Sequence, residues 1–409
     1  MPTPSKTLTP RGWALLIILL SLAVKVALVL VAGAKYDLVS DDRSYIDTAR
    51  IWVETGTFTY NDPTTPTVFV MPAFPALLAL IYSLTGDGFV FAQTVRVVQA
   101  VLVSAALFIV FETGRRVFSD RAAGVAICVA ALYPPFWLMG NLVLTEALFV
   151  VPLALLVFTS VRALETPSPK WAVLFALAWA ASVYVRPAVA LWPGLFLLLL
   201  FHWRPAPVRQ LAKAALVAAS VFILCLSPWW VRNYRATGHF VALTKSSGNP
   251  LLLGTFIGGG PPTEVQASWY SSSDVWVNDD LDLKWAKQRI RDGFRDHFRE
   301  YLGWYTYGKL REFWKMYYWL PIAGIPDPVV SAWHKVVVLM GLIGMGLARK
   351  SRPALLLVSL LIYVTLLHMI FLGHGRYSAP FMPVVILFAG HAAVELTRRF
   401  RKATPEPSR

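Results

Sequence analysis

The feature that most constrains this chain is a series of long apolar stretches. A helix needs about 20 mainly apolar residues to cross a bilayer. Ten stretches of about this kind follow one another along the sequence: 13–31, 89–111, 121–139, 142–163, 171–186, 188–201, 211–231, 329–348, 353–373 and 378–397. We expect the first to be a retained span, because it is too long for a cleaved signal peptide. The pattern predicts an all-α polytopic membrane protein with about ten transmembrane helices.

Composition excludes several other classes of protein. Of the 409 residues, 56% are hydrophobic and only 15% are charged, whereas soluble domains carry about 25% charged residues. An ordinary soluble enzyme, a disordered chain and a fibrous protein are therefore excluded. The only cysteines, Cys128 and Cys225, lie in apolar runs, which excludes a disulfide framework and a cysteine-based zinc site. The net charge is +15. In a membrane protein such an excess of Lys and Arg is explained by basic cytoplasmic loops, so we expect no nucleic-acid partner.

Basic residues are concentrated in alternate loops between the predicted spans. One set of loops and termini holds 18 basic residues against five acidic ones, while the rest of the chain holds 20 basic and 18 acidic residues. The positive-inside rule therefore predicts that the first set is cytoplasmic. Both termini are then cytoplasmic, which requires an even number of crossings, and ten crossings meet that requirement.

The extracytoplasmic side then carries two large loops, 32–88 and 232–328. Within them, the short apolar segment 72–84 and the amphipathic segment 284–318 are typical of helices that lie in the membrane interface. Loops on a rigid scaffold often carry function, so we expect any chemistry outside. An enzyme there needs a donor that is delivered in the membrane, because nucleotide sugars are cytoplasmic.

We divide the chain into three parts on this basis. Residues 1–231 form a transmembrane module with the first outer loop as its catalytic segment. Residues 232–328 form the second large outer loop with its interfacial helices. Residues 329–409 hold the last transmembrane helices and a basic cytoplasmic tail.

Three acidic residues are candidates for chemistry. Asp41 and Asp42 follow the first span, and an ionised carboxylate there can act as a base towards a hydroxyl group. Tyr45 lies four residues after Asp41, on the same helix face. Glu146, at the outer start of a span, is a partner or metal ligand for the pair; carboxylates without thiols suit Mg, Mn or Ca. The alternatives are that Asp41 only caps a helix and that Glu146 only complements a helix dipole.

Four arginines lie at the outer ends of predicted spans: Arg96, Arg186, Arg232 and Arg376. The guanidinium fork matches phosphate geometry, so together they predict a site for an anionic lipid headgroup. Taken singly, each such arginine is more often a snorkelling interfacial side chain. His374 and Tyr377 flank the last of the four, and Lys245 lies in the second outer loop; these three are further candidates.

Five local patterns resemble the GT-C superfamily of polytopic glycosyltransferases, specifically bacterial members of glycosyltransferase family 39. That family includes protein O-mannosyltransferases and the aminoarabinose transferases that act on lipid A. The patterns are an acidic pair followed by Tyr and Ala, a proline-rich segment, a second acidic site, a Pro-Trp-Trp-Val-Arg-Asn-Tyr stretch and an Arg-Tyr motif, at 41–49, 71–78, 144–149, 228–240 and 374–383. They extend over most of the chain in one order.

The resemblance implies a sugar transferase in the bacterial inner (plasma) membrane that uses a polyprenyl-phosphate-linked monosaccharide on the outer face. By analogy Asp41 matches the catalytic aspartate and Asp42 its acidic neighbour, with Glu146 nearby and the arginines on the donor phosphate. We hypothesise an inverting transfer in which Asp41 takes the proton of the acceptor hydroxyl. A lipid- or glycan-linked acceptor is favoured, and a protein Ser/Thr acceptor is the alternative.

Two other classes of function remain open at this point. A transporter or flippase needs ionisable residues near the bilayer midplane, where Lys25 and Lys335 are the main candidates. The sequence shows no internal repeat, which disfavours a repeat-based transporter. A non-catalytic scaffold that shares the fold is the other rival, because fold does not determine function.

Overall fold

The computed structural model describes residues 8–60, 65–258, 260, 274–315 and 324–403. Regular structure in these residues is helical, without β-strands. In chain order the helices are α1 (Pro10–Ala32), η1 (Gly33–Tyr36), α2 (Asp41–Thr55), α3 (Ala73–Thr85), α4 (Phe89–Val117), α5 (Asp120–Ala131), α6 (Pro134–Met139), α7 (Thr145–Glu165), α8 (Pro169–Val185), η2 (Pro187–Val189), α9 (Trp192–Trp203), α10 (Val208–Thr237), α11 (Gly248–Leu253), α13 (Val275–Asp296), α14 (Phe298–Gly303), the π-helical η3 (Trp304–Gly308), α15 (Lys309–Trp314), α16 (Asp327–Leu347), α17 (Arg352–Ile370), α18 (Gly375–Ser378), η4 (Ala379–Phe381) and α19 (Met382–Ala403).

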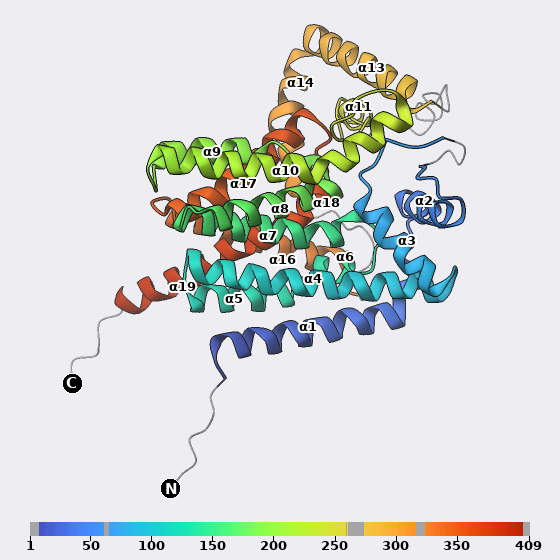
Figure 1. Cartoon of the computed structure of the whole chain (residues 1–409). Helices are drawn as coiled ribbons and strands as arrows, with labels where there is room; N and C mark the ends of the chain where they lie inside the picture. The colour runs from blue at the N-terminus through green and yellow to red at the C-terminus, as the bar shows by residue number, and fades with distance from the viewer. Residues whose placement is uncertain (1–7, 61–64, 259, 261–273, 316–323, 404–409) are drawn as a thin grey trace, which may run out of the picture.

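Seven described segments are long and apolar enough to cross a membrane: Pro10–Tyr36, Phe89–Val117, Thr145–Glu165, Val208–Thr237, Asp327–Leu347, Arg352–Ile370 and Gly375–Arg401. The predicted all-helical polytopic membrane fold is therefore confirmed. The other three expected crossings correspond to shorter helices. The stretch 121–139 is divided between α5 and α6, because Pro134 begins a new helix. The stretches 171–186 and 188–201 correspond to α8 and α9, which lie beside α10 in the same bundle (Figure 1).

Serine caps begin several of the bundle helices. The hydroxyls of Ser119, Ser168 and Ser351 accept hydrogen bonds from the backbone N–H three residues ahead, at the first turns of α5, α8 and α17. Such caps satisfy donors that a helix leaves unpaired at its start. Each of these three helices therefore begins at the residue after its serine.

Glycines let α19 pack against its neighbours at close range. A Cβ atom on Gly344 of α16 would collide with the backbone of Phe388, and one on Gly390 would collide with the carbonyl oxygen of Ala122 in α5. Close backbone approach through small residues is a common way for membrane helices to associate. The result is one apolar core that includes residues from Ala14 to Phe388, so the first and last helices share it.

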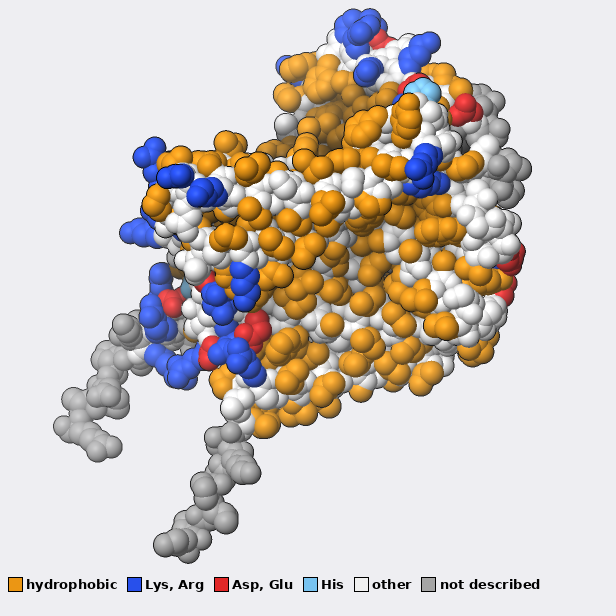
Figure 2. Space-filling view, viewed as in Figure 1, with side chains coloured by type: hydrophobic (Ala, Val, Ile, Leu, Met, Phe, Trp, Pro, Cys, Tyr) orange, Lys and Arg blue, Asp and Glu red, His pale blue; other side chains and the backbone are white. Residues whose placement is uncertain are grey.

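The two ends of the bundle differ in character. Both termini leave at one end, whereas α2 and α3 lie at the opposite end, with α11, α13 and α14 above it (Figure 1). Lys and Arg side chains gather at the end with the termini, and hydrophobic side chains cover the flank between the ends (Figure 2). Helices are present where interfacial helices are expected, as α3 and α13–α15; residues 316–318 of the second segment lie outside the described residues. Their interfacial position and the orientation of the chain stay predictions.

Candidate active site

An arginine that joins two carboxylates is the centre of the site. Arg376 donates from Nε to Oε1 of Glu146 at 2.6 Å and from Nη1 to Oδ2 of Asp41 at 2.6 Å. The side chain of Glu146 is 3% exposed and that of Asp41 is 47% exposed. The guanidinium thus connects a buried acid to an accessible one, and it does so between residues from distant parts of the sequence.

A second arginine shares the buried acid. Arg186, which ends α8, donates from Nη1 to the same Oε1 of Glu146 at 2.8 Å. Its guanidinium carbon lies 4.8 Å from the ring centroid of Tyr377, within the range of a cation–π interaction. Two guanidinium groups and two carboxylates therefore form one charge-balanced cluster, at the end of the bundle where α2 lies.

Asp41, Glu146 and Arg376 all lie at the starts of helices. Asp41 is the first residue of α2, Glu146 lies in the first turn of α7, and Arg376 lies in the first turn of α18. Acidic residues are favoured at these positions by the helix dipole. The dipole explains why these acids stand at helix starts, but the side chain of Asp41 is directed to Arg376 as well, so its contacts extend beyond local capping.

Tyr45 forms an apolar wall beside the cluster. It stands one turn after Asp41 on α2, and its ring packs edge-on against Phe74 at 5.1 Å and lies 5.6 Å from the ring of Tyr60. Burial raises the pKa of Tyr45, although the charges of Arg376 act in the opposite direction. The hydroxyl is therefore neutral at physiological pH and available as a hydrogen-bond donor.

Asp42 faces away from this cluster. Its carboxylate accepts hydrogen bonds from the N–H of Leu38 at 2.8 Å and of Ser40 at 2.7 Å. Between them Val39 adopts a left-handed conformation, with φ of 56°, which is uncommon for a β-branched residue. The structure therefore places Asp42, which is 3% exposed, under the turn that leads into α2, where it positions Asp41.

Arg96 is buried beside the start of the first outer loop. It donates to the carboxylate of Asp37 at 2.5 Å and to the carbonyl oxygen of Asn141 at 3.1 Å. These contacts connect η1 to the turn before α7. No described contact joins Arg96 to Asp41 or Glu146, so the structure keeps it apart from the central cluster.

Arg232 and Lys245 also bind other groups. Arg232 donates to the backbone carbonyl oxygens of Thr67 and Phe58, so it holds the first outer loop against the end of α10. Lys245 pairs with two adjacent aspartates of α13, at 3.1 Å and 2.6 Å, and its N–H donates to the carbonyl of Val68. Among the described contacts, both residues stabilise the outer loops, and neither contacts Asp41 or Glu146.

His374 precedes the central arginine. Its Nδ1 accepts a hydrogen bond from the backbone N–H of Arg376 at 3.3 Å, and its ring lies 6.2 Å from that of Tyr377. Burial and the neighbouring guanidinium lower the pKa of His374 to about 4. The imidazole is therefore neutral at pH 7 and supports the turn without adding a charge.

Lys309 is a residue that the sequence interpretation missed. Its Nζ donates to the carbonyl oxygens of Ile370 at 3.1 Å and Phe371 at 2.8 Å, and it lies 3.8 Å from the ring centroid of Tyr305. The side chain is fully buried, and burial lowers its pKa to about 7. Lys309 thus fixes the turn just before the Arg376 segment. The i,i+4 spacing of Tyr305 and Lys309 was the available signal.

The donor set does not make a metal site on its own. Nowhere in the described part of the chain do three His, Cys, Asp or Glu side chains gather at one place. The positive charge between Asp41 and Glu146 is the guanidinium of Arg376, and Asp42 is directed to backbone N–H groups. The described residues therefore do not fit a bound divalent ion of the kind that the carboxylates suggested in the sequence.

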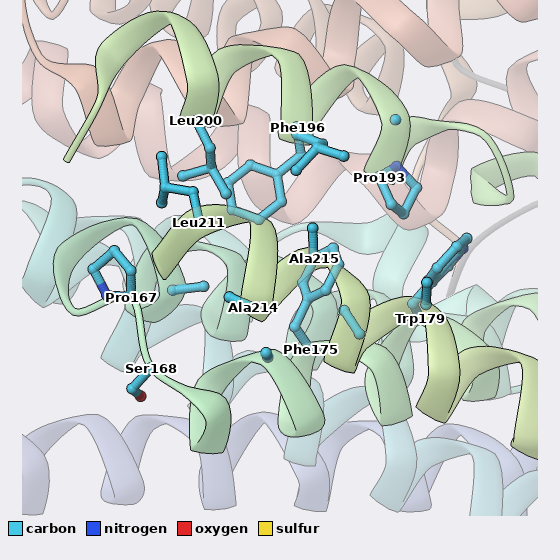
Figure 3. A pocket seen from close by; sticks show the side chains of 16 residues that line it. Pro167, Ser168, Phe175, Trp179, Pro193, Phe196, Leu200, Leu211, Ala214 and Ala215 are labelled. Atoms are coloured by element: carbon cyan, nitrogen blue, oxygen red, sulfur yellow. The ribbon is translucent and has the colours of Figure 1, made fainter. Parts of the chain in front are cut away.

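An apolar cavity lies deeper in the bundle, between α8, α9 and α10. Its volume is about 200 Å³. Aromatic and aliphatic side chains converge on it in Figure 3, among them Phe175, Trp179, Phe196, Leu200 and Leu211. Trp179 stands seven residues before Arg186 on α8, which is about 10 Å along a helix. The cavity therefore begins roughly two helical turns along α8 from the charged cluster, towards the start of that helix.

A family comparison agrees with this architecture. Residues 65–231 match the sequence profile of the family described as "Dolichyl-phosphate-mannose-protein mannosyltransferase". This segment is less than half of the chain, and it extends from α3 into α10, with Glu146 and Arg186 inside it. No curated protein sequence matches the chain.

Comparison with solved structures identifies the fold. The oligosaccharyltransferase AglB from Archaeoglobus fulgidus, solved with an inhibitory peptide and a dolichol-phosphate, superposes with a TM-score of 0.58 at 13% identity, over 97% of this chain and 52% of AglB. An Archaeoglobus fulgidus oligosaccharyltransferase in the apo form gives a TM-score of 0.56 at 14% identity, over 97% of this chain and 53% of that one. The chain thus spans about half the length of AglB. ArnT from Cupriavidus metallidurans with undecaprenyl phosphate gives 0.42 at 15% identity, over 96% and 81%.

These comparisons establish the fold of the chain. The chain has the fold of the GT-C glycosyltransferases, and the resemblance that the sequence motifs indicate is confirmed. Within that class, the family profile over residues 65–231 is of the mannosyltransferase type.

Proposed function

We propose that this protein is a membrane glycosyltransferase that moves a monosaccharide from a polyprenyl-phosphate-linked donor to a lipid- or glycan-linked acceptor. The observation that carries the proposal is the cluster of Asp41, Glu146, Arg186 and Arg376 at the end of the bundle opposite the basic loops. The match to the mannosyltransferase profile supports it, as does the likeness to AglB, which was solved with a dolichol-phosphate. We place the reaction on the extracytoplasmic face of the bacterial inner membrane, with both termini cytoplasmic.

In the proposed mechanism Asp41 is the general base. Its Oδ2 is held by Arg376, and among the described contacts its other oxygen has no hydrogen-bond partner. That oxygen takes the proton from an acceptor hydroxyl as the hydroxyl oxygen attacks the anomeric carbon. The bond from that carbon to the phosphate oxygen breaks, so the configuration inverts and polyprenyl phosphate leaves. A positioned base of this kind typically contributes about 10²–10⁴-fold.

The leaving phosphate needs charge stabilisation, which we assign to Arg376 and Arg186. Both guanidinium groups donate to the same buried oxygen of Glu146. Glu146 therefore holds the two guanidinium groups next to each other, where both can bind one phosphate. Preorganised donors of this kind stabilise developing charge without reorganisation during the reaction. We assign Arg96, Arg232 and Lys245 to the support of the outer loops, because their described partners are loop carbonyls and aspartates.

The apolar cavity between α8, α9 and α10 suits part of the polyprenyl tail. Gly194 lines it, and a Cβ atom there would meet nothing within 4 Å. A Gly194→Leu variant can therefore place its Cβ without a clash and reduces the space available to a lipid chain. We expect it to raise KM for a long-chain donor and to leave KM for a short-chain donor unchanged; equal effects on both donors would remove the cavity from the proposal.

A protein Ser/Thr acceptor is the second candidate within the same class. The family profile is described by transfer to protein. AglB was solved with an inhibitory peptide, and an Archaeoglobus fulgidus oligosaccharyltransferase was solved with an acceptor peptide. Transport is less favoured by the placement of the two intramembrane lysines. Lys25 is fully buried and donates to the hydroxyls of Ser21 and Ser104, and Lys335 is exposed on α16. Neither lysine lines the cavity described above.

A donor assay tests the proposal. Purified protein in detergent is given a panel of polyprenyl-phosphate sugars with either a membrane glycolipid extract or a Ser/Thr-rich peptide. We expect sugar transfer with one donor and with the glycolipid arm. Transfer only to peptide would select the second candidate. Absence of polyprenyl-phosphate binding, measured on the same preparation, would refute the enzyme proposal.

A further inference from the structure

A large apolar groove lies on the flank of the molecule, away from the site described above. Its volume is about 990 Å³. Helices α1, α5, α16 and α19 form its walls with apolar side chains: Ile17, Val129, Leu132, Trp333 and Val394. The fold leaves this space between helices of the first and last parts of the chain, and no step of the proposed sugar transfer uses it.

One end of the groove carries positive charge. Arg121 at the start of α5 and Arg398 and Arg401 near the end of α19 line it, together with Asp120. These helix ends lie where the chain termini leave the bundle, in the region of clustered basic side chains in Figure 2. Asp120 is paired with Arg115 at 2.7 Å outside the groove lining. The rim is therefore cationic where it meets the membrane surface.

Of the three arginines at this end of the groove, only one forms an ion pair with another described residue. Arg398 pairs with Glu395 at 2.9 Å, and both lie on α19. Arg121 and Arg401 form no ion pair with any described residue. Two guanidinium groups therefore remain at the head of an apolar channel, and guanidinium geometry matches phosphate.

The dimensions of the groove fit a lipid. Along α5 the lining extends from Arg121 to Leu132, which is about 16 Å at the helical rise per residue. A phosphate at Arg121 thus leaves room for an extended acyl chain that runs into the bilayer. Gly124 lies on this path, and the space above its Cα is open, because a Cβ atom there would meet nothing within 4 Å.

We propose that this groove is a binding site for an anionic membrane phospholipid. The lipid phosphate binds Arg121 and Arg401, and one acyl chain lies along α5 towards Leu132 and Trp333. The charge of the rim selects the headgroup, since each nearby Arg contributes roughly 1 kcal/mol of attraction to anionic lipid, a factor of about five. This site is independent of the proposed glycosyltransferase activity.

Native mass spectrometry of the delipidated full-length protein tests the proposal. The protein is titrated with phosphatidylglycerol, phosphatidylcholine, a polyprenyl phosphate and inorganic phosphate in separate arms. We expect phosphatidylglycerol to bind on the order of tenfold or more tightly than phosphatidylcholine. Equal affinity for the two phospholipids would overturn the proposal. Binding of polyprenyl phosphate alone, or of inorganic phosphate as tightly as the anionic lipid, would overturn it too.

Two pairs of variants locate the binding. Arg121→Ala with Arg401→Ala should reduce the affinity for phosphatidylglycerol to that for phosphatidylcholine. The matched control, Arg209→Ala with Arg349→Ala, removes two exposed arginines from predicted loops of the same end and should leave the preference intact. Equal loss in both double variants would show a diffuse surface effect and would refute a defined site.

A second pair probes the apolar part of the groove. Gly124→Leu should block the acyl-chain path and weaken both phospholipids. Gly346→Leu on α16 is the control, because a Cβ atom there also meets open space and Gly346 lies outside the groove. Unchanged lipid binding in Gly124→Leu would contradict the assignment. Unfolding temperatures of both variants establish that neither has lost its fold.

Cys128 offers an independent readout. It lines the groove and is exposed, so a bound acyl chain should slow its reaction with a maleimide. Cys225 is the internal reference, since it lies on α10, outside this groove. We expect phosphatidylglycerol to slow labelling of Cys128 at concentrations where phosphatidylcholine does not. An identical labelling rate with and without the anionic lipid would contradict the proposal.

Discussion

Replacement of Glu146 by Gln should destabilise the protein far more than its small change in shape suggests. The side chain is 3% exposed, and one of its oxygens accepts from both Arg186 and Arg376. Gln keeps the volume but removes the negative charge. Two guanidinium groups then face each other with only the half-exposed Asp41 to balance them. Breaking a buried ion pair by removal of one partner costs about 3–5 kcal/mol.

The same helix supplies the control. Glu165 ends α7 and also pairs with two arginines, Arg162 at 2.7 Å and Arg116 at 3.3 Å, but its side chain is 28% exposed. Exposed pairs contribute about 0–1 kcal/mol, so Glu165→Gln should change stability little. Unfolding in mixed detergent–SDS micelles, followed by tryptophan fluorescence, gives both free energies. A difference below about 1 kcal/mol between the two variants would refute the view that Glu146 neutralises a buried cationic pair.

A double variant sharpens the argument. When Arg186→Gln is added to Glu146→Gln, a single guanidinium group remains in the cluster, and Asp41 balances its charge. We therefore expect the double variant to be more stable than the sum of the two single effects predicts. Strict additivity would show that Arg186 and Glu146 act independently, since coupled neighbours deviate from additivity.

Three further perturbations follow from the site. Asp42→Ala should cost about 1–3 kcal/mol of unfolding free energy, because it leaves the N–H groups of Leu38 and Ser40 without their acceptor; an unchanged denaturation midpoint would contradict this role. Burial lowers the pKa of Lys309 to about 7, below its unfolded value of about 10.4, so the unfolded chain binds more protons between these values and stability should rise with pH there. Lys309→Met should flatten the rise in unfolding temperature from pH 7 to pH 9, and an identical slope in both proteins would count against it. Chelation with EDTA should leave sugar transfer unchanged, because Arg376 supplies the cation between the acids; loss of turnover that Mg²⁺ or Mn²⁺ restores would show that a metal is required.

Sequence patterns predicted the membrane architecture well, because hydrophobic length is a local property. The long helices α1, α4, α7, α10, α16, α17 and α19 correspond to predicted spans. The pattern was less informative where apolar stretches contain a break. Residues 122–139 carry no charged side chain, yet Pro134 starts a new helix there, since proline lacks the N–H that a continuing helix needs.

The contacts of the charged residues were harder to predict. The arginines at the outer ends of spans are equivalent in sequence, but only Arg186 and Arg376 reach Glu146. Arg96 instead contacts Asp37 and the carbonyl oxygen of Asn141, and Arg232 contacts carbonyl oxygens of the first outer loop. Position along a helix fixes the depth of a side chain, whereas its partner depends on how helices pack around one another. Adjacent Asp41 and Asp42 diverge for the same reason, because neighbouring helical residues point in different directions.

The central claim is that Asp41 is the base of a sugar transfer, and one comparison tests it most directly. Asp41→Asn keeps shape and hydrogen bonding but removes the basic oxygen. Asp47→Asn is its control on the same helix, where Asp47 is exposed and pairs with Arg50 at 2.8 Å. Turnover of both variants is measured with the donor that the wild type uses, alongside binding of that donor. We predict that Asp41→Asn binds the donor but loses about 10²–10⁴-fold in turnover, while Asp47→Asn matches the wild type. Wild-type turnover in Asp41→Asn would contradict the account.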